Sequence, residues 1–203
     1  MKILLYGGSF DPPHNGHLNN LRAAAERVHP DKIVVMPAGT SPFKEGTNAS
    51  GALRLEMCRC FAALAQEPGM PPLEVSGWEV AQAAAGSRNY TVLTLEMLAR
   101  ENPGAILYLA IGSDMLLSFD RWREPENICR LAHLVVIARD ECDRRAIARK
   151  ASWLKQTWQA QVEIVDCPAL PVSSTEIRAD RARCREMVPE KVFAYITAHQ
   201  LYF

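Results

Sequence analysis

Two histidines near the start of the chain have the spacing and the neighbours of a phosphate site. His14 and His17 enclose an Asn-Gly pair and follow Gly7-Gly8 and Ser9-Phe10, where a predicted strand gives way to a predicted helix. The glycine pair permits a sharp turn and a close approach of the backbone to a ligand. The first N–H groups of the helix attract an anion, to which both imidazoles can donate hydrogen bonds. The alternative is a strand-to-helix turn that carries two surface histidines.

A second polar stretch, Ser-Ser-Thr-Glu-Ile-Arg at residues 173–178, follows the last predicted strand. Ser173 and Glu176 have the spacing of a helix capping box, which explains these two residues structurally. It does not explain Arg178, which we expect in the first helical turn, where a cation opposes the helix dipole by roughly 0.3–1 kcal/mol. A bound triphosphate would remove that conflict, and the hydroxyls of Ser174 and Thr175 could contact it.

A third basic residue, Lys44, ends the loop segment Thr-Ser-Pro-Phe-Lys. Its ammonium group can offer a point charge to a triphosphate. A solvated loop with a surface lysine is the alternative, and the loop alone favours it.

Further candidates follow the most apolar predicted strand. Gly112 permits close approach of a ligand, and Asp114 can accept hydrogen bonds from ribose hydroxyls; helix capping by Ser113 or Asp114 is the alternative. Trp122 stands among charged residues, either as a stacking surface or packed under its loop.

The elements that must position these residues alternate along the chain. Apolar, β-branched runs predict strands at residues 2–6, 32–36, 73–75, 105–111, 133–138 and 162–165. Helical periodicity predicts helices at residues 17–28, 53–65, 92–99, 143–158, 173–180 and 189–199. Near-continuous apolar strands separated by helices indicate a doubly wound, Rossmann-like α/β fold, a parallel sheet with helices on both faces. Ligands bind such sheets at the carboxyl ends of the strands, and most of the candidate loops follow strands.

Composition excludes several classes of protein. The chain of 203 residues predicts a single domain, 1–203, with a C-terminal helical part at about 173–203. Its 23 basic and 23 acidic residues balance, which argues against a nucleic-acid partner. No apolar run predicts a membrane span, and the first residues do not resemble a signal peptide. The six cysteines form no Cys-x-x-Cys pair; we expect reduced thiols, no protein metal site and a cytoplasmic location.

The stretch at residues 7–17, Gly-Gly-Ser-Phe-Asp-Pro-Pro-His-Asn-Gly-His, resembles the signature of the nucleotidyltransferase superfamily. Its Gly-Gly head is similar to that of bacterial nicotinate mononucleotide adenylyltransferases, and residues 173–178 resemble the second signature, Ser-Ser-Thr-x-x-Arg. The resemblance implies that His14 and His17 bind the ATP phosphates and stabilise charge on the transferring phosphorus. It implies that Arg178 and the preceding hydroxyls hold the β- and γ-phosphates. The third loop of the family ends in Pro-His-Lys; here Phe43 replaces the histidine before Lys44.

The same resemblance covers the chain from Lys2 to Tyr202 and assigns the acceptor side. It implies that Gly112 and Asp114 contact the nucleotides, that Trp122 stacks on the nicotinate ring, and that helix-start amides at Tyr90 and Thr91 bind the nicotinate carboxylate. The ATP-binding set implied by the motifs comprises Gly7, Gly8, Ser9, Phe10, His14, His17, Gly112, Asp114, Ser174, Thr175 and Arg178.

The implied reaction is adenylyl transfer from ATP to nicotinate mononucleotide, giving deamido-NAD and pyrophosphate, with Mg²⁺ on the ATP phosphates. His14, His17, Lys44 and Arg178 are the candidate catalytic residues. The alternatives are another phosphorylated acceptor such as phosphopantetheine or nicotinamide mononucleotide, CMP transfer, or a non-catalytic nucleotide sensor. The sequence leaves open whether the chain is a monomer or a homo-oligomer.

Overall fold

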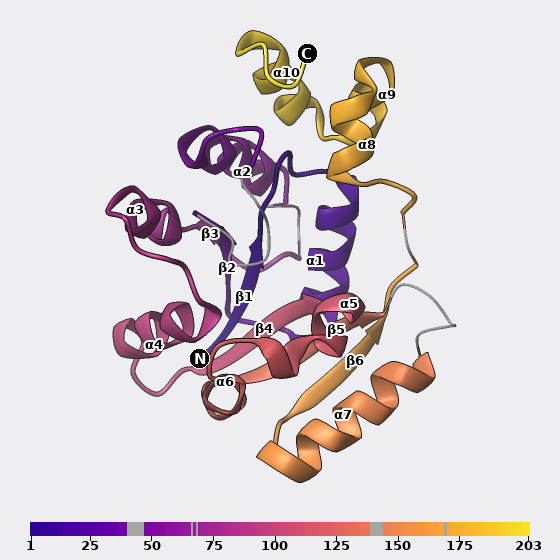
Figure 1. Ribbon diagram of the computed structural model, residues 1–203. Helices are drawn as coiled ribbons and strands as arrows, with labels where there is room; N and C mark the ends of the chain where they lie inside the picture. The colour runs from indigo at the N-terminus through magenta and orange to yellow at the C-terminus, as the bar shows by residue number, and fades with distance from the viewer. Residues whose placement is uncertain (40–46, 66, 68, 139–143, 169) are drawn as a thin grey trace. The chain divides into compact units, whose positions relative to one another are not determined.

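The computed structural model describes the chain apart from residues 40–46, 66, 68, 139–143 and 169. Its strands form one six-stranded sheet in the order β3-β2-β1-β4-β5-β6 (Figure 1). β4 pairs in parallel with β1 and β5, and β5 pairs in parallel with β6. From β1 the chain adds β2 and β3 on one side and β4, β5 and β6 on the other, which is the arrangement of a doubly wound α/β sheet. The strands are β1 Lys2–Gly8, β2 Lys32–Pro37, β3 Leu73–Val75, β4 Ile106–Gly112, β5 Ala132–Ala138 and β6 Val162–Asp166.

All six predicted strands and all six predicted helices are present, and the doubly wound α/β fold is confirmed. The helices that were predicted are α1 Asn15–Val28, α2 Gly51–Ala65, α4 Thr91–Glu101, α7 Arg144–Trp158, α8 Ser174–Ala179 and α10 Glu190–Ala198. Five further short segments were not predicted: α3 Trp78–Ala84, α5 Ser113–Leu117, the 3-10 turn η1 Phe119–Arg121, α6 Pro125–Leu131 and α9 Arg181–Met187. These segments span two turns or fewer, which is too short for a 3.6-residue period to stand out.

The end of β1 differs from the prediction that it stops at the glycine pair. β1 continues through Gly7 and Gly8, because the Gly8 carbonyl accepts a hydrogen bond from Ala38 N at 2.9 Å. A Cβ at Gly8 would lie 3.0 Å from the Phe10 ring, so the missing side chain makes room for that buried ring. The glycine therefore lets the chain fold back tightly just before the histidines.

The described chain divides into two compact units, and β1, α1 and β2 each contribute residues to both. The first unit comprises Met1–Tyr6, Asn20–Ile33 and Tyr90–Ala169. The side chains of residues 107–111 in β4 and 134–138 in β5 are buried and form its core. α5 and α6 contact β5, and α7, orange in Figure 1, contacts α5 and α6.

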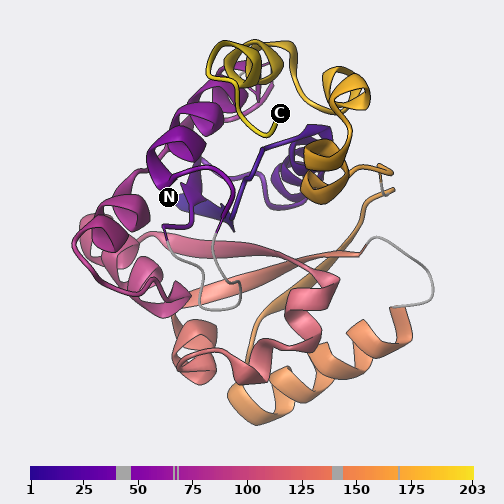
Figure 2. The same ribbon diagram turned by 45° about the horizontal axis from the view of Figure 1, so that its top comes forward.

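The second unit comprises Gly7–Asn19, Val34–Asn89 and Leu170–Phe203. Within it α2 contacts β3, α3 and α10, and α10 lies beside α2 (Figure 2). α8 contacts α9, which contacts α10, so the predicted C-terminal helical part consists of these three helices. That the whole chain folds as a single domain stays a prediction.

The five cysteines in the described part of the chain are free thiols, as expected; Cys142 lies outside it. Burial raises the pKa of Cys58, and raises that of Cys129 to about 11. These thiols therefore stay protonated and unreactive near neutral pH. None of the helices is long and apolar enough to cross a membrane, within the described residues.

Candidate active site

The two histidines of the first motif lie against each other at the start of α1. The His14 backbone N–H donates to His17 Nδ1 at 3.1 Å, and the two ring centroids are 3.7 Å apart. Because Nδ1 of His17 accepts this bond, the proton of the neutral ring lies on Nε2, which is then a donor. The Phe10 ring packs edge-on against His17, with centroids 5.0 Å apart. The structure thus fixes both the orientation and the donor atom of His17.

Gly16, between the histidines, permits a close contact with the segment that leads to the second motif. A Cβ at Gly16 would lie 3.0 Å from Val172 Cγ1 and 3.1 Å from the His14 ring. Only glycine leaves enough room here for both neighbours. The two motifs, about 160 residues apart in the sequence, therefore pack directly against each other.

Hydrogen bonds join the second motif to the backbone of the first. Ser174 Oγ donates to the Pro12 carbonyl at 2.9 Å, and Arg178 Nη1 donates to the Asp11 carbonyl at 2.7 Å. Arg178 Nη2 donates to Thr175 Oγ1 at 3.3 Å. The proposed phosphate ligands of α8 are thereby held next to the loop that carries the histidines.

The capping interpretation of the second motif is confirmed for Ser173 and Glu176. Ser173 Oγ accepts from Glu176 N at 3.2 Å and donates to Glu176 Oε2 at 2.8 Å. The prediction that Arg178 lies in the first helical turn and opposes the helix dipole was wrong, however. α8 has only six residues, and Arg178 lies in its last turn, where a cation is favourable. The case for Arg178 as a phosphate ligand rests instead on its contact with the first motif.

A buried arginine that was not predicted from the sequence, Arg54, lies against the loop of the first motif. Arg54 of α2 is 0% exposed, and its guanidinium donates to four backbone carbonyls. Nη1 donates to Ser9 and Ala38 at 2.7 and 2.6 Å, Nη2 to Gly39 at 3.0 Å, and Nε to Ala49 at 3.2 Å. Burial lowers the pKa of Arg54, and the nearby Asp11 carboxylate opposes that shift.

A signal for Arg54 was present in the sequence. The apolar spacing predicts a buried face of Leu53, Met57, Phe61 and Leu64, but Leu53 is only half-buried, and the Leu64 side chain lies outside the described residues. The face in fact consists of Arg54, Met57, Cys58 and Phe61, each 0% exposed, at helical spacing i, i+3, i+4 and i+7. A charged residue in phase with an apolar stripe indicates a buried, fully bonded side chain.

Asp11, within the first motif, is the acidic counterpart of Arg54. Its side chain is 5% exposed and accepts three hydrogen bonds. Oδ2 accepts from Asn48 N at 2.7 Å, and Oδ1 accepts from Ala49 N at 3.1 Å and from the Tyr202 hydroxyl at 2.9 Å. Asp11 and Arg54 together hold the loop of the first motif against residues 38–39, 48–49 and the C-terminal tail.

In the first unit, the residue next to Trp122, Arg123, contacts Tyr90 at the start of α4. Tyr90 is the N-cap of α4, Thr91 is its first residue, and the Arg123 guanidinium lies 4.7 Å from the centroid of the Tyr90 ring. Trp122 is partly exposed, with its ring centroid 5.2 Å from that of the buried Phe119. The Trp122 ring is thus packed against Phe119 and only partly buried.

Gly112 and Asp114 stand at the carboxyl end of β4, as predicted from the strand. Gly112 is the N-cap of α5, and this cap involves no side-chain hydrogen bond. Capping by Ser113 or Asp114 is therefore not what the structure shows. Asp114 lies in the first turn of α5 with an exposed side chain. Its carboxylate can accept hydrogen bonds from a nucleotide.

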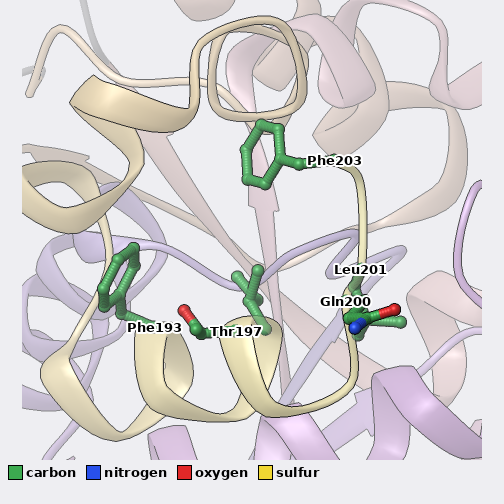
Figure 3. A pocket seen from close by; sticks show the side chains of 6 residues that line it. Phe193, Thr197, Gln200, Leu201 and Phe203 are labelled. Carbon is green, nitrogen blue, oxygen red and sulfur yellow. The ribbon is translucent and has the colours of Figure 1, made fainter.

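Some candidates are not placed by this structure. Lys44, and Phe43 before it, lie outside the described residues. In the described part of the chain, no group of three His, Cys, Asp or Glu side chains could hold a metal ion. A shallow pocket of about 210 Å³ on α10 and the tail contains none of the predicted site residues (Figure 3). Its lining consists of Phe193, Ile196, Thr197, Gln200, Leu201 and Phe203.

The doubly wound sheet and the His-Asn-Gly-His turn after its first strand define a nucleotidyltransferase-type α/β protein. The model of the cytidylyltransferase-like family matches residues 5–180. Relatives that carry the name "Probable nicotinate-nucleotide adenylyltransferase" include proteins from Rhodopirellula baltica and Chloroherpeton thalassium. The relative from Rhodopirellula baltica is 38% identical and covers 98% of this chain and 92% of its own. The relative from Chloroherpeton thalassium is 35% identical, and the match covers 99% of this chain and 97% of its own.

The chain therefore belongs to the nicotinate-nucleotide adenylyltransferases of the cytidylyltransferase-like family. Its fold is also that of a solved structure, the nicotinic acid mononucleotide adenylyltransferase of Plasmodium falciparum complexed with NaAD. The TM-score is 0.75 at 19% identity, over 99% of this chain and 97% of that one.

Proposed function

We propose that this protein transfers the adenylyl group of ATP to nicotinate mononucleotide, releasing pyrophosphate and forming deamido-NAD. The observation that carries the proposal is the docking of the second motif on the first. The Arg178–Asp11 and Ser174–Pro12 hydrogen bonds gather the cationic and hydroxyl groups next to the paired histidines. Family membership supports the choice of acceptor.

The proposed reaction needs no nucleophile from the protein. The 5′-phosphate of the acceptor attacks the α-phosphorus of ATP, the bond to the bridging oxygen breaks, and pyrophosphate leaves with that electron pair. The protein contributes alignment and charge stabilisation. In this proposal His17 Nε2–H and His14 donate hydrogen bonds to the transferring phosphate, Arg178 binds the leaving group, and Lys44 adds a second cation.

Nucleotidyltransferases generally use a divalent metal, and we propose Mg²⁺. Mg²⁺ prefers octahedral oxygen ligands and usually keeps several waters while it binds substrate phosphates. The proposal therefore requires no protein cage for the ion. The ion would neutralise phosphate charge alongside Arg178 and the histidines.

Pyrophosphate release from Mg-ATP, measured with a panel of 5′-phosphorylated acceptors, tests the proposed function. Turnover with nicotinate mononucleotide supports it. Turnover only with phosphopantetheine, or with CTP in place of ATP, would place the chain elsewhere in the superfamily. No turnover with any acceptor, despite nucleotide binding, would indicate a sensor. The substrates, the cytoplasmic location and the monomer-or-oligomer question stay predictions.

We expect a preference for the acid over the amide form of the acceptor. The N-terminus of α4 has no acidic residue in its first turn, and Arg123 lies beside Tyr90. Helix-start amides bind a carboxylate, whereas a carboxamide would turn its NH₂ toward donors at roughly 1–3 kcal/mol. The kcat/KM for nicotinate mononucleotide should exceed that for nicotinamide mononucleotide by about tenfold to a hundredfold.

Side-by-side kinetics with the two mononucleotides measure this preference. Trp122→Phe is the control, because ring stacking does not distinguish the two charges and should lower both efficiencies alike. Equal efficiency for the two acceptors, or a preference for the amide, would contradict the proposed pocket while leaving adenylyl transfer itself intact.

Arg178→Lys should weaken the use of ATP. A lysine offers one point charge, so it cannot keep the bonds to Asp11 and Thr175 and also contact a phosphate. We expect a kcat/KM for ATP lower by about tenfold or more, with a nearly unchanged Tm. If Tm fell and activity were kept, Arg178 would serve only to dock α8.

A further inference from the structure

The last residues of the chain fold back from α10 toward the first motif. Leu201 N donates to the Ile196 carbonyl at 3.0 Å and Gln200 N to the Thr197 carbonyl at 3.3 Å, which turns the tail after the helix. Figure 3 shows Gln200, Leu201 and Phe203 on this returning segment. The tail therefore has a fixed path, and Tyr202 lies within it.

Tyr202 adopts a backbone conformation that side chains rarely take. Its φ is 73°, in the left-handed region, which a non-glycine residue keeps only when its surroundings enforce it. Its hydroxyl donates to Asp11 Oδ1 at 2.9 Å, so the side chain is anchored at its far end. Burial raises the pKa of Tyr202, as does the Asp11 carboxylate, so the phenol remains a proton donor.

Asp11 links this hydroxyl to the proposed phosphate ligand on α8. Its carboxylate is held by three donors, of which Tyr202 is the only side chain among the described residues. Its backbone carbonyl accepts from Arg178 Nη1 at 2.7 Å. With the carboxylate fixed, the peptide of Asp11 is fixed as well, and its carbonyl keeps Arg178 in one orientation.

We propose that Tyr202 is a positioning residue for the ATP phosphates, acting through Asp11 on Arg178. The proposal rests on the proposed function, because it takes Arg178 as a ligand of the nucleotide. A buried carboxylate that loses one donor gains no water in its place and shifts within its loop. The Asp11 carbonyl then moves with it, and Arg178 loses its preset orientation.

Tyr202→Phe tests this role, because it removes only the hydroxyl that donates to Asp11. We expect the Kd for Mg-ATP without acceptor, and the KM for ATP, to rise by about threefold to tenfold, the equivalent of one lost hydrogen bond. The KM for nicotinate mononucleotide should not change. Tyr195→Phe is the matched control: Tyr195 is on α10, and its hydroxyl has no hydrogen-bond partner among the described residues. This control should bind ATP as the wild type does.

A double variant separates positioning from packing. If Tyr202 acts through Arg178, adding Tyr202→Phe to Arg178→Lys should change the Kd for Mg-ATP by less than about twofold. Fully additive effects would overturn the proposal, as would an unchanged Kd in Tyr202→Phe alone. A general loss of Tm that raises the KM of both substrates equally would also overturn it and leave a structural role.

The proposal and the proposed function can fail separately. A wild-type protein that binds Mg-ATP but forms no product from nicotinate mononucleotide contradicts the function, while the two Kd values still test Tyr202. A wild-type protein that forms product, with Tyr202→Phe indistinguishable from it in ATP affinity, contradicts the inference alone.

Discussion

Replacing His17 with alanine should lower kcat by about two to three orders of magnitude, the cost of removing one preorganised charge-stabilising donor. The bond from His14 N to His17 Nδ1 leaves Nε2–H as the donor, and packing against Phe10 fixes the ring. A donor held in place before the reaction stabilises charge that develops at the phosphorus only in the transition state. The KM for ATP should therefore change much less than kcat.

Steady-state pyrophosphate release, with Tm as a check on folding, measures this effect. His199→Ala is the matched control, because His199 is exposed at the end of α10 and belongs to neither motif. The control should keep the wild-type kcat. Near-normal turnover by a folded His17→Ala protein would leave the role proposed for this histidine without support.

The position of His17 was predictable because its signal is local. Strand, glycine pair, histidines and helix follow one another within 28 residues, and each element has its own period or turn residue. The sheet was predictable for the same reason, since parallel strands buried on both faces are near-continuous apolar runs. That both motifs follow strands was predictable as well, since ligands of such sheets bind at the carboxyl ends of the strands.

What could not be predicted depends on contacts between distant segments. The position of Arg178 within α8 depends on where that helix ends, and a capping box marks only the beginning. The pairing of Arg123 with Tyr90 joins two loops that no periodicity connects. Tyr202 reaches Asp11 across 191 residues of sequence, and a tyrosine in a polar tail carries no sign of its partner.

Arg54→Met should destabilise the fold by about 3–5 kcal/mol, the range for removing one member of a buried charged pair. The substitution keeps the volume of the side chain and removes the donors of four carbonyls, at Ser9, Ala38, Gly39 and Ala49. Asp11 loses its cation at the same time. For a chain of this size the change corresponds to a Tm lower by about 6–20 °C. Urea denaturation gives the free energy directly.

Two comparisons test whether this stability comes from the hydrogen bonds of Arg54 or from the packing of α2. Arg59 lies on α2 as well, but it is exposed and forms its ion pair with Glu56 on the same helix, so for Arg59→Met we expect a cost below about 1 kcal/mol. Arg54→Lys keeps the charge, yet one ammonium cannot reach all four carbonyls, so its stability should fall between those of the wild type and Arg54→Met. If Arg54→Met lowered the free energy of unfolding no more than Arg59→Met, apolar packing alone would hold the loop of the first motif.

If instead the loss is as large as expected, adding Asp11→Asn should cost much less stability in the Arg54→Met background than in the wild type. Without the buried cation, the carboxylate of Asp11 keeps its three hydrogen bonds but loses the charge that offsets its burial.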